Sequence, residues 1–137
     1  MNVFAGVSER AWGVAVPHHP RGAGLARASL HAKLRELGID RDLAADAVTV
    51  VSELVGNAAR HARPLRGGVI SVSCIASTRE RVEVSVTDGG AAGMPTLRTA
   101  DADAVDGRGL QIVAGLAARW GVEIEGKRRR VWAVLTA

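Results

Sequence analysis

The chain has 137 residues, a formal net charge of +4 at pH 7 and only 3% aromatic residues. This length fits one compact domain, and its core must be built mainly from Val, Leu, Ile and Ala. The four basic residues at 127–130 equal the whole excess of positive charge. A basic cluster confined to one place argues against a direct nucleic-acid binder, which spreads its charge over a face.

The only cysteine, Cys74, excludes an internal disulfide and suits a reducing cytoplasm. No segment approaches the about 20 apolar residues of a membrane-spanning helix. The first residues also lack the apolar run of a signal peptide. We therefore expect one cytoplasmic domain over residues 1–137, without direct nucleic-acid or membrane partners.

The N-terminal half begins with alternating apolar positions in residues 1–16, which predict an edge strand that Pro17 ends. Apolar residues at helical spacing then predict a helix over residues 22–37. A longer helix is predicted over 41–62, with Asp40 as its N-cap. This second helix has the broadest apolar face of the chain.

The C-terminal half favours a sheet. Residues 69–75 and 82–87 alternate between apolar and polar side chains, as neighbouring antiparallel strands do. Residues 88–108 are rich in Gly, Ala and Asp and predict a long functional loop. A short helix over 109–118 and a hairpin within 122–135 complete the chain. This order predicts an α/β two-layer sandwich, with a mixed, largely antiparallel sheet and helices on one face.

Polar side chains stand at the edge of the apolar stripe on the long predicted helix. Glu53 and Asn57 are four residues apart and share one helix face. A carboxamide oxygen suits Mg²⁺ beside phosphates, and a carboxylate can orient or deprotonate a nucleophile. The spacing alone also fits two solvated residues on a helix flank, and by itself it favours that plainer interpretation.

Two glycine-containing segments offer further candidate sites. Asp88 ends a predicted strand and precedes Gly89 and Gly90, so its carboxylate could accept from an adenine amino group. An ordinary Asp-Gly turn explains the same residues. The run Gly-Arg-Gly-Leu at 107–110 opens a predicted helix, where backbone amides can bind phosphate. A flexible loop ended by a helix cap is the alternative.

Taken in order, these segments resemble the three boxes of the histidine-kinase-like (GHKL) ATPases. Residues 52–62, SELVGNAARHA, resemble the N box. Residues 88–90 with Gly-Met-Pro at 93–95 resemble the G1 box, and residues 107–110 resemble the G2 box. The resemblance extends over nearly the whole chain from about residue 20. It is strongest to small actinobacterial proteins similar to anti-sigma factor serine kinases, whose endings are similar to residues 116–121 and 131–135.

The resemblance implies the histidine-kinase-like ATPase (Bergerat) fold, with ATP and Mg²⁺ as ligands. Glu53 would be the catalytic carboxylate and Asn57 the Mg²⁺ ligand. Asp88 would accept from the adenine amino group, with Gly90 allowing close approach. The other implied nucleotide-binding residues are Met94, Gly107, Arg108, Gly109 and Leu110. The segment at about 91–106 would form a lid.

Two positions depart from the family pattern. The G1 box usually reads Asp-x-Gly-x-Gly, but Ala92 takes the place of its second glycine and Gly93 comes one residue late. Near the last strand the family often has a threonine that supports adenine through water, and Arg130 stands at about that place. Both departures bear on how adenine would be bound.

Three functions follow from this resemblance. The first is an ATP-binding regulatory protein of the anti-sigma type, a serine/threonine kinase that phosphorylates an antagonist protein, holds a sigma factor and forms a homodimer. The second is a nucleotide-dependent protein-binding module without phosphotransfer. The third is the catalytic domain of a split histidine kinase, although no segment resembles a phospho-acceptor helix. The basic cluster at 127–130 would be solvated or would contact an acidic partner.

Overall fold

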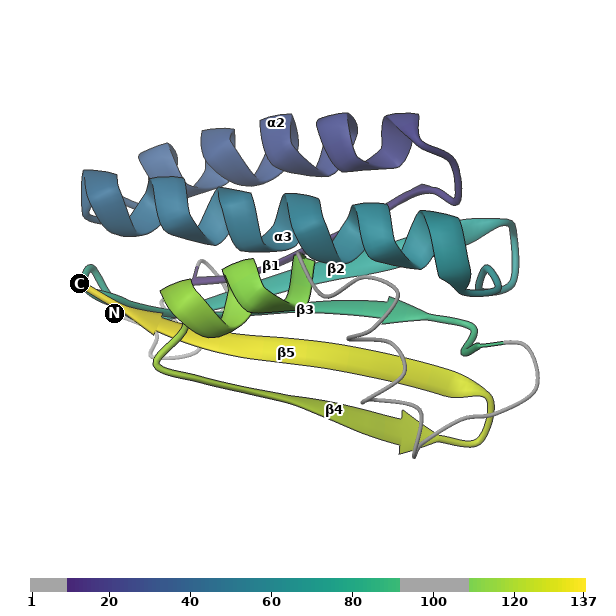
Figure 1. The fold of residues 1–137 in the computed structure, drawn as a ribbon. Coiled ribbons are helices and arrows are strands. Elements are labelled where there is room, and N and C mark those ends of the chain that lie inside the picture. Colours follow the sequence, from purple (N-terminus) through teal and green to yellow (C-terminus); the bar gives the residue numbers. More distant parts are fainter. Residues whose placement is uncertain (1–9, 92–108) are drawn as a thin grey trace.

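The computed structural model describes residues 10–91 and 109–137 (Figure 1). Residues 109–116 are helical and carry no label. The labelled elements are β1 (Ala11–Pro17), α2 (Arg21–Glu36), α3 (Arg41–His61), β2 (Val69–Thr78), β3 (Arg81–Asp88), β4 (Arg119–Glu125) and β5 (Arg128–Thr136).

The described strands form a five-stranded sheet in the order β1-β2-β3-β5-β4. Each neighbouring pair is antiparallel. Figure 1 shows α2, α3 and the helical residues 109–116 on the same face of this sheet. The predicted two-layer α/β sandwich with helices on one face is therefore confirmed.

Local interactions stabilise the helix ends, and the cap at Asp40 is the one predicted from the sequence. The Asp40 carboxylate accepts from the Leu43 backbone N–H at 3.0 Å and caps α3. Gly38 follows α2 with a φ of 72°, a conformation that glycine adopts without strain. At the other end of α3, the Ala62 carbonyl lies 2.7 Å from Nε2 of His18. A helix end and the end of β1 are thereby joined.

The main core lies between α3 and the inner face of the sheet, the face that the helices cover. On β3 the inner residues are Val82, Val84 and Val86, and all three are buried. Their register partners on β5 are also buried: Leu135, Ala133 and Val131. On the outer face of the sheet, the Trp132 ring packs directly against Gly121.

The structure corrects the boundaries of the C-terminal elements. The helix predicted over 109–118 ends at residue 116, and β4 begins at Arg119 instead of at residue 122. The Ala118 N–H donates to the Val134 carbonyl at 2.8 Å. Pairing with β5 therefore satisfies the backbone before the helix can continue. Within residues 10–91 and 109–137, no helix is both long and apolar enough to cross a membrane.

Candidate functional site

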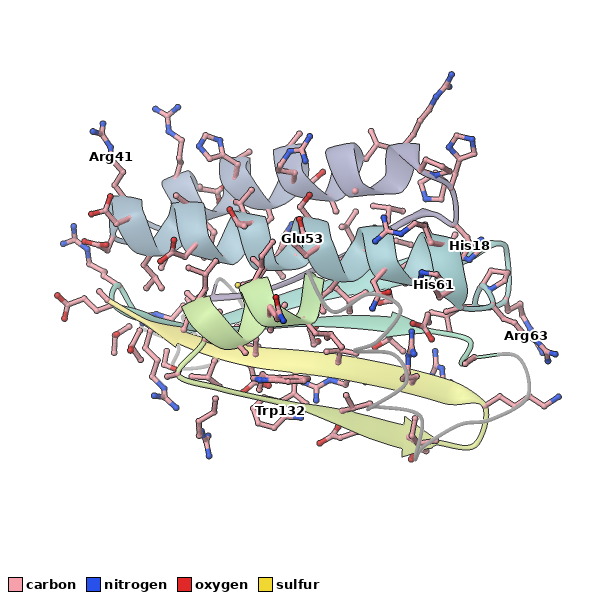
Figure 2. The ribbon with its side chains drawn as sticks, in the orientation of Figure 1. His18, Arg41, Glu53, His61, Arg63 and Trp132 are labelled. Atoms are coloured by element: carbon pink, nitrogen blue, oxygen red, sulfur yellow. The ribbon has the colours of Figure 1, made fainter. Side chains whose placement is uncertain are left out.

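Glu53 and Asn57 lie one turn apart on α3, and both are partly buried. Figure 2 shows Glu53 on the side of α3 near the helical residues 109–116. A Cβ placed on Gly109 would lie only 3.4 Å from Oε1 of Glu53. The glutamate predicted from the N box thus lies beside Gly109, the first described residue of the helix predicted from the G2 box. Tertiary folding brings these two distant parts of the sequence together.

The polar atoms of Glu53 and Asn57 are not occupied by other residues of the described part of the chain. Neither side chain forms a hydrogen bond or an ion pair with the residues that the structure describes. Two partly buried polar groups close to Gly109 can bind a polar ligand or water. No group of three or more His, Cys, Asp or Glu residues gathers within the described ranges. Mg²⁺ bound with nucleotide needs no such cluster, because phosphates and water supply most of its ligands.

Asp88 occupies the end of β3 and is only 1% exposed. Its Oδ1 accepts from the Gly90 N–H at 2.7 Å. Its Oδ2 accepts from Arg129, from Nη2 at 2.9 Å and from Nε at 3.3 Å. The buried carboxylate is therefore paired within the protein, and its oxygens keep lone pairs for one further donor.

The glycines after Asp88 have a structural requirement of their own. A Cβ on Gly89 would collide with the Pro64 carbonyl, and a Cβ on Gly90 would collide with the Lys127 carbonyl. Gly90 also has a φ of 85°. The backbone of the β4–β5 turn therefore requires glycine at position 90, apart from the predicted approach of a ligand there.

The arginine that faces the predicted adenine site is Arg129. Arg130 lies on the outer face of the sheet, where it donates to Glu83 and Glu123 at 2.9 Å each. The prediction that Arg130 stands at the adenine-supporting position is therefore wrong. Successive residues of a strand point to opposite faces, and the register pairs Asp88 with Arg129. The sequence could have indicated Arg129, because it lies two residues before the inner position Val131 and so on the same face of β5. The predicted strand began only at residue 131 and did not include it.

A cavity of about 230 Å³ opens where the end of β3, the chain after α3 and the β4–β5 turn meet. Its lining includes Arg63, Gly90, Ile124, Lys127 and Arg129. Among them, Ile124 is 36% exposed and supplies an apolar surface. An apolar wall beside a few convergent polar groups is the usual form of a small-ligand site.

Residues 16–135 match the model of the histidine kinase-like ATPase domain family. The chain belongs to this family. The match includes the α3 glutamate and asparagine, the buried aspartate and the helical residues 109–116. Membership implies ATP as the nucleotide.

This ATPase-family domain also resembles a solved structure, that of the RsbU and RsbW domains of Rv1364c from Mycobacterium tuberculosis. The TM-score is 0.70 at 21% sequence identity, a likeness that shows the shared fold. The alignment covers 92% of this chain and 32% of that one, so this chain spans about a third of that protein. No curated protein matches.

Several predicted site residues of the ATPase-family domain are outside the described residues, and one is buried. Met94, Gly107 and Arg108, together with Ala92 and nearly all of the predicted lid at 91–106, lie outside the described residues. Leu110 is 7% exposed and packs its side chain inward. Any contact of Leu110 with phosphate would therefore come from its backbone.

Proposed function

We propose that the chain is an ATP-binding regulatory protein that acts as a serine/threonine kinase of the anti-sigma type on a small antagonist protein. The nearness of Glu53 to Gly109, where the sequence predicts the beginning of the helix over 109–118, supports this proposal. A helix N-terminus favours anions, so phosphates bound there would lie beside a carboxylate. That is the arrangement in which a base can act on a hydroxyl attacking the terminal phosphate.

Each site residue has a role in this proposal. Glu53 would orient the seryl or threonyl hydroxyl and accept its proton as the new oxygen–phosphorus bond forms. The bond between the γ-phosphorus and the bridging oxygen breaks at the same time, and ADP leaves. Asn57 would hold Mg²⁺, which neutralises phosphate charge when bound. Asp88 would accept from the amino group of adenine, and Gly90 would allow the adenine ring to approach closely.

The remaining roles rest on sequence. Gly107, Arg108, Gly109 and Leu110 would bind phosphate, and Met94 would contact the nucleotide from the segment 91–106. A sigma factor as second partner, a homodimer, a single domain over 1–137 and a cytoplasmic location complete the proposed regulatory system. Membership of the ATPase family supports this system, but it does not by itself name the substrate.

Phosphosite mapping tests the proposal. The wild-type protein and Glu53→Ala are used as bait in a pull-down with and without Mg-ATP, and the captured proteins are analysed for phosphoserine and phosphothreonine. We expect one small captured protein to carry a phosphate with wild type and almost none with the variant. Equal phosphorylation with both baits would remove Glu53 from the reaction.

A binding module without phosphotransfer is the second candidate. The Asp88–Arg129 ion pair fits this module as well as it fits a kinase, because nucleotide binding at that pair does not require phosphotransfer. This module would bind ATP and a protein partner yet transfer no phosphate. Wild-type protein that binds ATP by calorimetry, hydrolyses none and labels no captured protein would establish this alternative.

A further inference from the structure

Arg129 is the polar side chain that lies between the buried aspartate and the cavity. Its side chain is 17% exposed, whereas that of Asp88 is 2% exposed. Among the described residues, Arg129 contributes to the cavity lining and Asp88 does not. A base entering this cavity would therefore meet the guanidinium before the carboxylate.

The guanidinium of Arg129 has N–H groups that its ion pair with Asp88 does not use. It has five N–H groups in a fixed plane. Two of them donate to Oδ2 of Asp88, one from Nε and one from Nη2. The other three have no partner among the residues that the structure describes. Asp88 thus orients a planar donor group at the wall of the cavity.

The residue beside Arg129 on the neighbouring strand suits a flat ring. Ile124 is the register partner of Arg129 on β4, and it is partly exposed on the inner face. Gly90 lies beside them without a side chain. An aromatic base could pack on the apolar side chain while its polar edge faces Arg129. The amino group of adenine is flanked by two ring nitrogens, N1 and N7, and both accept hydrogen bonds.

We propose that Arg129 is a specificity-determining residue that donates to a ring nitrogen of adenine next to the amino group. The proposal rests on the function proposed above and identifies how the base is recognised. Asp88 would accept a hydrogen bond from the amino group on the same edge of the base. It also fixes the orientation of the Arg129 guanidinium through their ion pair. In this proposal Arg129 donates directly to adenine, whereas the family resemblance implied a threonine that supports adenine through water.

Binding calorimetry with ATP, 1-deaza-ATP and 7-deaza-ATP tests the proposal, because each analogue replaces one ring nitrogen with C–H. Wild type should bind one analogue about tenfold to a hundredfold more weakly than ATP, the usual effect of losing a hydrogen bond from a charged donor. Arg129→Met should bind that analogue and ATP with similar affinity. Arg130→Met is the matched control, since it removes the neighbouring paired arginine from the opposite face and should keep the wild-type preference.

Arg129→Gln serves if Arg129→Met does not fold. It keeps an amide donor for Asp88, but its shorter side chain leaves no donor for the base, so the same loss of preference is expected. Unchanged preference in the Arg129 variant would mean that Arg129 only supports Asp88, and would overturn the proposal. Equal wild-type affinity for all three nucleotides would overturn it too. Wild type that binds no ATP would instead refute the proposed function itself.

Discussion

Asp88 and Arg129 form a two-donor ion pair across strands β3 and β5, with both arginine nitrogens on the same carboxylate oxygen. The pair joins the end of a buried strand to the β4–β5 hairpin. It also makes the charge of Asp88 tolerable, because a buried carboxylate without a partner is costly. Any change at Asp88 therefore acts on the proposed base site and on Arg129 together.

Asp88→Asn is expected to weaken ATP binding about tenfold to a hundredfold. The change keeps the shape but removes the charged acceptor, and a hydrogen bond to a charged group contributes roughly 1.5–3 kcal/mol. Isothermal calorimetry with Mg-ATP measures the effect. Asp42→Asn, which alters an exposed carboxylate in the first turn of α3, is the control and should bind as wild type does. Unaltered affinity in Asp88→Asn would remove Asp88 from the site.

Glu53→Ala and Asn57→Ala are expected to fail at different steps. Asn57→Ala should lose Mg-dependent nucleotide binding, because the proposed metal ligand is gone. Glu53→Ala should bind ATP but transfer phosphate about 10² to 10⁴ times more slowly, the usual contribution of a general base. Calorimetry and phosphate-transfer rates separate the two. Full activity of Glu53→Ala would show that its assigned role is wrong.

Gly90→Ala is expected to destabilise the fold more than Gly67→Ala. Both glycines have a positive φ, 85° and 89°. A Cβ at Gly67 meets open space, whereas one at Gly90 collides with the Lys127 carbonyl. Strain from a positive φ alone costs about 1 kcal/mol, and the collision adds to it at Gly90. Urea unfolding of both variants measures the difference, and equal losses would contradict this account of Gly90.

Cys74 is expected to resist thiol reagents in the folded protein. Burial raises the pKa of the Cys74 thiol to about 12, because desolvation disfavours the thiolate. At pH 7 to 9 the thiol therefore stays protonated, and reactivity should appear only as pH approaches the raised pKa or after unfolding. Iodoacetamide labelling followed by mass spectrometry, with and without urea, tests this. Rapid labelling of the native protein at pH 8 would contradict it.

The basic cluster at 127–130 is expected not to bind DNA at physiological ionic strength. Arg129 is paired with Asp88, and Arg130 is paired with Glu83 and Glu123. Few positive charges are then left for phosphates, and a protein that contacts few phosphates binds DNA only weakly at physiological salt. A gel-shift assay over a range of salt concentrations measures this. A stable shift at physiological salt would contradict the prediction.

The sequence alone determined the order of the elements, the cap of α3 at Asp40 and the alternating inner face of β2 and β3. These features depend on neighbouring residues, whose periodicity and turn chemistry are visible in the chain. The order of its three boxes likewise indicated the ATPase family, which the family match confirms.

Only the tertiary structure decided which groups meet. The nearness of Glu53 to Gly109 depends on how α3 packs beside the helical residues 109–116. The choice of Arg129 over Arg130 depends on the register between β3 and β5, because a shift of one residue exchanges the two faces of a strand. Gly90 is required by the backbone at Lys127, which lies far away in the sequence. Such long-range pairings follow from packing of the whole sheet, and no local pattern specifies them.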